Sequence, residues 1–413
     1  MTPEKLYRYE LGLLSLLVLV LPSLEALKTF FWFSYLCIFL IRRFQNGSLS
    51  LIPTKPANIA VTLYLSVTLI STLVNWPFDN GFKGFLDEFR FLTLFLCLYS
   101  AGYTAAEYRR IALLIIVGVL GGLLYGLVEF LLGMRTDFQF HSAGILTQSS
   151  IYLGIAIILN TGLLLNPEKD SSRLRIFLKV ALFIQMIALI YIGSRGSMLA
   201  VMLALVFIAF LKLNIGTLMV WFAGLTVSVV LVATLIQIFP DNVFSKDIIN
   251  QYSIERIKKS DNQRIGAWKV ALAKLAQGED LVWGVGPRNY KTINDMEFVQ
   301  QNEKFSQIKS FGHAHNLFLT QLIEQGIIGL LAMFYFFFLI LQKIISIWRA
   351  ESSHTLSWAW YGGIGGLIVP LIAGLFNTPF YQEHAMLAMI VIGMMFASTE
   401  VGSGDIQPNI HTR

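Results

Sequence analysis

The chain has 413 residues, of which 55% are hydrophobic and only 14% are charged. Soluble globular domains carry roughly 25% charged residues, so the composition excludes an ordinary soluble domain. The formal net charge of +6 reflects membrane topology, as described below, and is not a signal of nucleic-acid binding.

Apolar runs of about 20 residues, long enough to cross the hydrocarbon core of a bilayer, recur along nearly the whole sequence. They predict an all-α polytopic membrane protein with about twelve transmembrane helices, near 11–24, 26–41, 57–74, 85–103, 111–132, 148–165, 176–192, 197–211, 217–239, 314–342, 357–376 and 384–399. Lys5 and Arg8 precede the first run, as in a signal peptide. Pro22, Ser23 and Glu25 offer no small-residue cleavage site, so we interpret this run as a retained span.

The distribution of basic residues predicts the orientation of the spans, because Lys and Arg near span ends collect on the cytoplasmic side. With a cytoplasmic N-terminus, the inner segments carry fifteen such residues: Lys5, Arg8, Arg42, Arg43, Lys55, Arg109, Arg110, Lys169, Arg173, Arg175, Lys179, Lys212, Lys343, Arg349 and Arg413. The short outer segments carry five: Lys28, Lys83, Arg90, Arg135 and Arg195. This pattern predicts nine spans in residues 1–239, one large outer loop at 240–313, and three spans with a cytoplasmic tail in 314–413.

The outer loop is predicted to contain short helices. Ser260 and Gln263 have the spacing of a capping box, and apolar residues then recur at helical spacing up to Gly278, namely Ile265, Trp268, Leu272 and Leu275. We therefore expect an amphipathic helix on the membrane surface, followed by a turn at 284–287.

One arginine stands between two apolar spans, in the segment Gly193-Ser194-Arg195-Gly196-Ser197. A guanidinium there is costly unless it snorkels to the interface or meets an anion. Flanking glycines allow a ligand to approach the backbone closely, and Ser197 could cap the next helix. A snorkelling arginine in a tight turn remains the alternative.

Arg264 falls in the first turn of the predicted loop helix, where a positive side chain opposes the helix dipole. A bound phosphate would reconcile the two, because helix N-termini bind anions and arginine adds bidentate contacts. A solvated ion pair with Asp261 is the alternative. Arg288, after the glycine-rich turn, is a similar candidate.

Two histidines, His313 and His315, directly precede the tenth span. Their spacing differs from the i, i+4 pair of a zinc site. No Asp-x-Asp pair occurs in the chain, so the sequence predicts no metal cofactor. A histidine at a helix N-terminus is kept neutral by the helix dipole, which makes His315 a candidate general base. An interfacial histidine bonded to backbone is the alternative.

Other charged residues interrupt the spans. Glu324 lies about two turns into the tenth span and needs a partner. Asp87, Glu88 and Arg90 interrupt the fourth span, where they either line the same cavity or satisfy one another. Glu383 and His384 are interpreted as interfacial residues without a specific role.

These motifs, in this order, resemble the O-antigen ligase and polymerase family of bacterial membrane glycosyltransferases. The matching pieces are Gly193 to Gly196, Arg264 with Trp268, Gly284 to Gly286, and His313 to Asn316 leading through Glu324 and Gly326 to Gly329. The stretch 22–28 resembles openings associated with ligases.

The resemblance implies a GT-C-like fold and a metal-independent, inverting transfer at the periplasmic face of the bacterial inner membrane. The donor would be a glycan on undecaprenyl pyrophosphate, and the acceptor a hydroxyl of the lipid A core of lipopolysaccharide. Arg195 and Arg264, with Arg288 as a further candidate, would hold the pyrophosphate, and His315 would accept the proton. His313 ranks second, and Trp268 would rest near the lipid.

Two other functions stay open on the sequence. An O-antigen polymerase or a protein ligase would use the same donor with another acceptor. A transporter of lipid-linked glycan would also have about twelve spans, but transporters usually show repeated broken helices in both halves around a central site. Here the unusual residues gather at one face.

Overall fold

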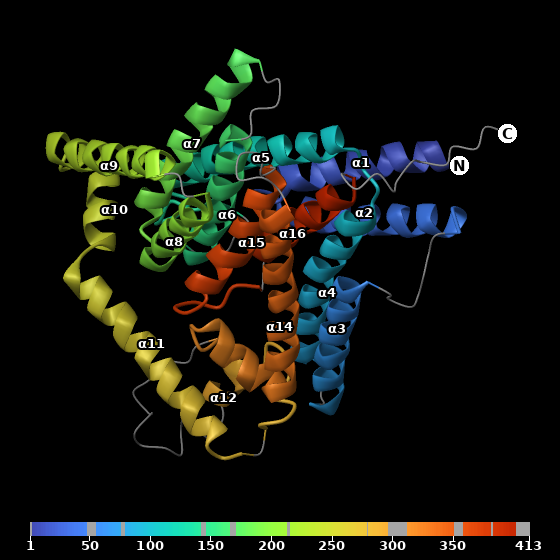
Figure 1. The fold of residues 1–413 in the computed structure, drawn as a ribbon. Coiled ribbons are helices and arrows are strands. Elements are labelled where there is room, and N and C mark those ends of the chain that lie inside the picture. Colours follow the sequence, from blue (N-terminus) through green and yellow to red (C-terminus); the bar gives the residue numbers. More distant parts are fainter. Residues whose placement is uncertain are drawn as a thin grey trace.

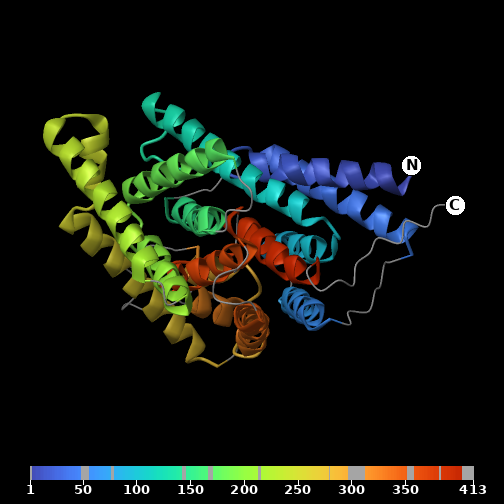
Figure 2. The same ribbon diagram turned by 45° about the horizontal axis from the view of Figure 1, so that its top comes forward.

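The computed structural model describes residues 2–47, 55–75, 79–141, 146–165, 171–212, 215–278, 280–295, 312–350, 358–380 and 383–401. These residues form helices and contain no strand. Outside the loop that follows α9, the described residues form twelve helices: α1 (Pro3–Val20), α2 (Glu25–Gln45), α3 (Pro56–Val74), α4 (Asp79–Ser100), α5 (Ala105–Leu131), α6 (Leu146–Leu165), α7 (Ser172–Ile192), α8 (Arg195–Lys212), α9 (Ile215–Ile238), α14 (Leu317–Ala350), α15 (Trp358–Ala373) and α16 (Glu383–Val401). Figure 1 shows their arrangement, and Figure 2 shows it from a tilted view.

Each of the twelve expected spans falls on one of these helices, so the segmentation of the sequence into helices is confirmed. Among the described residues, five helices are both long and apolar enough to cross a membrane: α3, α5, α6, α7 and α14. Shorter apolar stretches occur in α8, α9, α15 and α16. The chain is therefore a multi-pass helical membrane protein, and the full number of crossings stays a prediction.

The loop after α9 contains α10 (Val243–Gln251), α11 (Ile254–Leu275) and α12 (Tyr290–Asp295). In Figure 1, α11 runs diagonally from α10 to the region of α12, beside the rest of the bundle. Two parts of the predicted architecture, 296–311 of this loop and the tail 402–413, lie outside the described residues, as do Lys169 and Arg413.

The capping box predicted at Ser260 is wrong. The helix begins earlier, where the Ser253 side chain accepts a hydrogen bond of 3.3 Å from the backbone N–H of Arg256. Ser253 competes better as N-cap because the residues that follow it already continue the helical pattern. Arg264 therefore lies in the middle of α11, and the helix-dipole argument does not apply to it.

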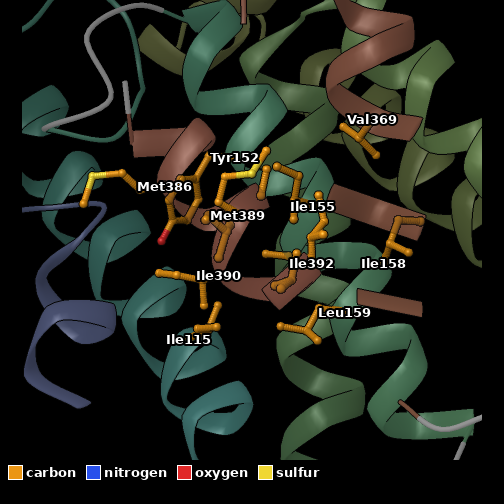
Figure 3. Close-up of a cluster of buried hydrophobic side chains, with 14 of the residues drawn as sticks. Ile115, Tyr152, Ile155, Ile158, Leu159, Val369, Met386, Met389, Ile390 and Ile392 are labelled. Carbon is orange, nitrogen blue, oxygen red and sulfur yellow. The ribbon is translucent and has the colours of Figure 1, made fainter. Parts of the chain in front are cut away.

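The core of the bundle is formed by α6, α15 and α16. Every residue of α6 from Gln148 to Leu163 is buried, which is typical of a helix surrounded by other helices. Figure 3 shows Ile155, Ile158 and Leu159 of α6 beside Val369 of α15 and the Met386–Ile392 segment of α16. These central helices hold the ends of α7, α8 and α14 in fixed positions.

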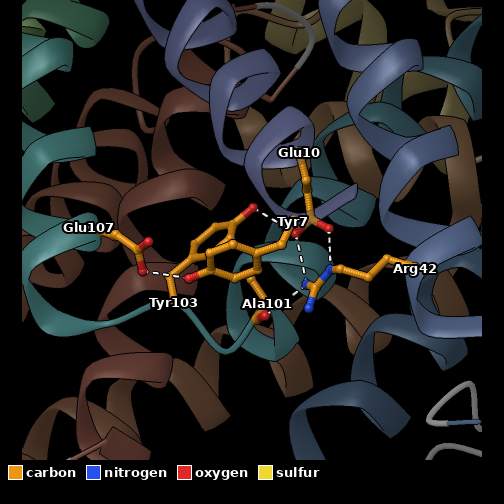
Figure 4. Close-up of polar contacts among 6 residues, drawn as sticks. All are labelled: Tyr7, Glu10, Arg42, Ala101, Tyr103 and Glu107. Atoms are coloured by element: carbon orange, nitrogen blue, oxygen red, sulfur yellow. Dashed lines mark hydrogen bonds and ion pairs between the residues drawn. The ribbon is translucent and has the colours of Figure 1, made fainter. Parts of the chain in front are cut away.

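A buried ion pair joins α1 to α2 at the end of the bundle predicted to be cytoplasmic. Arg42 donates to Glu10 from Nε at 2.6 Å and from Nη2 at 2.9 Å, and donates also to the Ala101 carbonyl at 2.8 Å (Figure 4). The Tyr103 hydroxyl donates to the same carboxylate at 2.7 Å. With these partners the buried charges are compensated, as stability requires.

At the opposite ends of the helices, Lys28 of α2 forms an ion pair with Glu383 of α16, and both side chains are buried. His384 is fully buried, and its Nε2 accepts a hydrogen bond from the backbone N–H of Phe380. The interpretation of Glu383 and His384 as interfacial residues is therefore wrong. Lys28, the partner of Glu383, lies far away in the chain, which is why the local sequence did not reveal this ion pair.

The turn at 284–287 docks on a break in α14. Gly326 has φ 68° and ψ −171°, a conformation available essentially only to glycine, and it interrupts the helix. The backbone N–H groups of Val285 and Gly286 donate to the carbonyls of Ile323 and Glu324 at 2.9 and 2.8 Å. A Cβ on Gly284 would lie 2.4 Å from the Glu324 carbonyl, and a Cβ on Gly326 would lie 2.1 Å from the Val282 carbonyl. The glycines on both sides thus allow the turn to approach the backbone of α14 closely.

Candidate active site

Arg195 is positioned by the sharp turn between α7 and α8. Gly193 ends α7 in the left-handed conformation, at φ 71°, and Arg195 is the first residue of α8. Glycine is favoured at this turn because its φ lies in the left-handed region, which L side chains rarely adopt. Ser194, and not Ser197, precedes the helix, and its carbonyl accepts from the N–H of Met198. Arg195 thus stands at a helix N-terminus, which favours anions.

Arg195 and Arg264 meet at one carboxylate. Asp261 Oδ1 lies 2.9 Å from Nη2 of Arg195 and 3.4 Å from Nη1 of Arg264. The Arg264–Asp261 ion pair, which was the alternative interpretation of this arginine, is thus present. The same oxygen also pairs with Arg195, so Asp261 joins α11 to the start of α8 and brings together two arginines that are far apart in the sequence.

The two arginines line a pocket of about 410 Å³ together with Asp261, Trp268 and Phe376. Nε of Arg264 and Nε1 of Trp268 are buried there and have no hydrogen-bond partner in the described part of the chain. Burial lowers the pKa of Arg264, Asp261 raises it, and the neighbouring charge of Arg195 lowers it further. This pocket, with more positive than negative groups and two unused donors, is suited to bind an anion.

A second, smaller pocket of about 120 Å³ shares Arg195 and Arg264 and adds Arg256 from the first part of α11. Arg256 Nη2 lies 3.4 Å from Oδ1 of Asp137, in the segment between α5 and α6. Three arginines therefore surround the N-terminus of α8, against two carboxylates.

The histidines lie just before α14, whose first turn is capped by Asn316 through a 3.0 Å bond from the N–H of Leu319. The N–H of His315 donates to Nδ1 of His313 at 3.1 Å, and the two rings meet edge to face. Nδ1 of His313 must therefore carry its lone pair. His315 has φ 51°, in the left-handed region that few side chains other than asparagine, aspartate and histidine adopt.

Burial, and not a helix dipole, is the main cause that lowers the pKa of His315 to about 3, with further contributions from His313 and from the positive charge of Arg264. Burial likewise lowers the pKa of His313 to about 4.

Backbone contacts independently join the histidine segment to the arginine pocket. The side-chain amide of Asn316 donates to the Leu375 carbonyl at 3.1 Å, and the N–H of Leu317 donates to the Gly374 carbonyl at 2.7 Å. The next residue, Phe376, lines the arginine pocket and packs beside Gly196. The segment after α15 thus connects the start of α14, which directly follows the histidines, to the wall of the arginine pocket.

The remaining predicted site residues form a separate group around the ends of α3, α4 and α14. Arg288 pairs with Asp87 at 2.5 Å, and Glu324 accepts from the N–H of Tyr290 at 3.3 Å. Arg90 stacks over the Trp32 ring at 5.6 Å. None of these contacts reaches Arg195 or Arg264, and neither arginine pocket is lined by Arg288, Arg90 or Glu324. The structure therefore does not support placing these three residues in the arginine pocket.

Sequence reasoning missed the joining role of Asp261 as well as Arg256 and Phe376. One signal was available for Arg256: at i, i+4 and i+8, Arg256, Ser260 and Arg264 follow one face of a helix that starts at Ser253. Phe376 had no comparable signal. Among the described residues, no group of three or more His, Cys, Asp or Glu side chains could hold a metal ion.

A comparison with curated proteins gives no match. A family model described as O-antigen ligase matches residues 180–334, from the second half of α7 into α14. The matched segment contains Arg195, Arg264, His313 and His315, the residues whose order carried the resemblance. Over this segment, the chain is similar to the O-antigen ligase family.

Proposed function

We propose that the protein is an O-antigen ligase that transfers a glycan from undecaprenyl pyrophosphate to a hydroxyl of the lipid A core. The observation that carries this proposal is the convergence of Arg195 and Arg264 on one oxygen of Asp261, in a pocket beside His315. Phosphate contacts next to a neutral base suit the transfer of a group from a lipid phosphate.

In the proposed reaction, the acceptor oxygen attacks the anomeric carbon of the donor sugar from the side opposite the pyrophosphate. The bond between that carbon and the pyrophosphate oxygen breaks, and the electron pair leaves with the pyrophosphate. Arg195 and Arg264 stabilise the charge that develops on the leaving group, and preorganised donors of this kind act most strongly in a site that excludes water. The attack inverts the configuration at the anomeric carbon.

Asp261 is proposed to hold the two arginines in place until the donor arrives. Its side chain is 46% exposed, and such exposed ion pairs contribute only about 0–1 kcal/mol. A pyrophosphate, which offers bidentate contacts to each guanidinium, can therefore replace the carboxylate at little cost.

His315 is proposed to accept the proton of the acceptor hydroxyl. A pKa of about 3 keeps the imidazole unprotonated, but it also makes a weak base. Since Arg264 contributes to this low pKa, the negative charge of a bound pyrophosphate would offset that contribution and strengthen the base. His313 is a positioning residue, because its Nδ1 holds the backbone of His315 in its unusual conformation.

The site is proposed to face the periplasm of a bacterial inner membrane, within a GT-C-like fold of twelve spans. Contacts of the loop support a site on one side of the membrane. The Tyr252 hydroxyl donates to the carbonyl of Ile190, near the end of α7. The Ser71 hydroxyl, near the end of α3, donates to the carbonyl of Trp283 in the loop. The basic-residue pattern assigns both of these helix ends to the outer side.

Disruption of the gene tests the proposal. A ligase defect leaves long O-antigen attached to its lipid carrier, whereas a polymerase defect gives lipopolysaccharide with a single O-antigen unit. Normal O-antigen lipopolysaccharide in the disrupted strain would contradict both functions.

Complementation with His315→Asn then tests the base. Asparagine tolerates the left-handed conformation, so this variant removes the imidazole with less backbone strain than alanine would cause. We expect no transfer with His315→Asn and a milder defect with His313→Asn. Near-normal transfer by His315→Asn would show that His315 is not the base.

A further inference from the structure

An apolar groove lies beside the arginine pockets, outside the site described above. It has a volume of about 470 Å³ and is formed by α5, α7, α9 and α10. Leu124 of α5 and Leu235 of α9, which line it, are 63% and 46% exposed, so the groove opens to the surface that faces lipid. On α7 its lining residues are Ile184, Ile187, Ala188 and Tyr191, which share one helix face.

The groove adjoins the smaller arginine pocket. Tyr191, near the end of α7, lines the groove, and the next two residues, Ile192 and Gly193, line the pocket. On α10, Ile248 lines the groove, and Gln251, one turn further, lines the pocket. Phe138 lines the groove, and its neighbour Asp137 pairs with Arg256 of the pocket.

The end of the groove nearest the arginines is aromatic. The ring of Tyr191 meets those of Phe138 and Phe244 at 5.4 and 5.7 Å. Away from this end, the stripe on α7 from Tyr191 to Ile184 extends for about 10 Å along the helix. The surface therefore changes from cationic to aromatic to aliphatic within a short distance, which matches a lipid with a charged head and a hydrocarbon chain.

We infer that this groove holds the first isoprene units of the donor's polyprenyl chain while its pyrophosphate occupies the arginine pockets. The inference rests on the proposed function. The chain of a polyprenyl pyrophosphate is bonded directly to the phosphate, so it must leave the arginines through an adjoining apolar surface. The acyl chains of the acceptor are separated from the reacting hydroxyl by core sugars, so they fit a groove at this distance less well.

A chain-length comparison tests the inference. Ala188→Phe and Ser245→Phe fill the groove from α7 and α10. The matched control is Val206→Phe, at a 40% exposed position of α8 that lines neither the groove nor the arginine pockets. Transfer is measured with two donors that carry the same glycan, one on undecaprenyl pyrophosphate and one on a pyrophosphate with two isoprene units.

Because the displaced part of the chain no longer buries its apolar surface in the groove, we expect the filling variants to lower kcat/KM about tenfold or more with the long donor. With the short donor we expect less than about a twofold change, and Val206→Phe should alter neither value. Equal losses with both donors, or no loss with the long donor, would overturn the inference.

A binding assay separates this inference from the proposed function, because it needs no transfer. A photoreactive benzoylphenylalanine replaces Leu124 in the groove or, as control, Leu63, a 45% exposed leucine of α3, which contributes no residue to the groove. The probe is radiolabelled undecaprenyl pyrophosphate without glycan. Labelling at 124 that exceeds labelling at 63 and is lost in Arg195→Ala supports the inference, even if the protein transfers no glycan.

Two results of this assay would overturn the inference. Equal labelling at 124 and 63 would mean that the groove takes bulk membrane lipid. Displacement of the label by lipid A core, but not by unlabelled undecaprenyl pyrophosphate, would assign the groove to the acceptor.

Discussion

The arrangement of Arg195 and Arg264 around one carboxylate oxygen predicts that their substitutions are not independent. We consider Arg195→Ala, Arg264→Ala and the double variant, together with Arg→Lys at each position. Loss of one preorganised donor to a developing charge costs about 10²-fold in rate, or about 2.7 kcal/mol. Two independent contacts would thus cost about 10⁴-fold together.

The structure favours a smaller combined loss. Asp261 lies 2.9 Å from one guanidinium and 3.4 Å from the other, so removing either arginine also disturbs the other. Groups that share a partner show interaction energies of about 0.5–3 kcal/mol. We therefore expect the double variant to lose about 10²- to 10³-fold. Lysine keeps the charge but loses the planar fork, so each Arg→Lys variant should lie between wild type and alanine.

The assay is glycan transfer by purified protein in nanodiscs, measured as kcat/KM for the donor. Arg135→Ala is the matched control, because Arg135 is also ion-paired, with Glu129 at 3.1 Å, and lines neither arginine pocket. Its transfer rate should stay near that of wild type. Fully additive losses of about 10⁴-fold, or full activity of both lysine variants, would refute the shared clamp.

Four further outcomes are expected. Asp261→Asn should reduce transfer less than about tenfold, because the exposed ion pairs are weak; a loss as large as that of Arg195→Ala would point to Asp261 as the base. Transfer should persist in excess EDTA, because arginines are proposed to stabilise the leaving group; recovery of lost activity on addition of Mg²⁺ would contradict this. Gly326→Ala should lower the unfolding free energy by about 2 kcal/mol or more, because its Cβ would lie 2.1 Å from the Val282 carbonyl in a strained conformation; an unchanged melting temperature would show that the break tolerates a side chain. Finally, burial lowers the folded-state pKa of His313 to about 4 from about 6.5, so the unfolded chain binds the proton first as the pH falls. This stability is present above pH 6.5 and should decline between about pH 6.5 and 4, and His313→Asn should flatten the decline in thermal melts.

The sequence was sufficient to predict the helices. Each apolar run became one helix because, in a hydrocarbon core, a helix satisfies the backbone hydrogen bonds within its own segment. It was also sufficient to find Arg195, Arg264 and the two histidines, because charged and polar groups are conspicuous when they interrupt or border apolar runs. The start of α11 was misplaced because two serines, Ser253 and Ser260, could each cap a helix. Only Ser253 accepts the capping hydrogen bond, from the backbone N–H of Arg256.

The sequence did not reveal which charged groups share a site. Arg264, at a predicted helix start, and Arg288, after a glycine-rich turn, were both candidates for binding phosphate. In the structure, Arg288 pairs with Asp87 of α4, whereas Arg264 pairs with Asp261. Glu383 looked incidental and is a buried partner of Lys28. Ion pairing depends on distances between helix ends, and these follow from how the helices pack, which no local pattern encodes.

Local composition alone thus determined the helical membrane class, the helix positions and the candidate chemistry of this chain, because the cost of exposing backbone or charge to lipid acts on each segment separately. Tertiary structure alone decided that Asp261 joins Arg195 to Arg264, that Asn316 and Leu317 contact the segment just before Phe376, and that an apolar groove adjoins the arginine pocket. These relations arise from the packing of the helices, which brings side chains far apart in the sequence within contact distance.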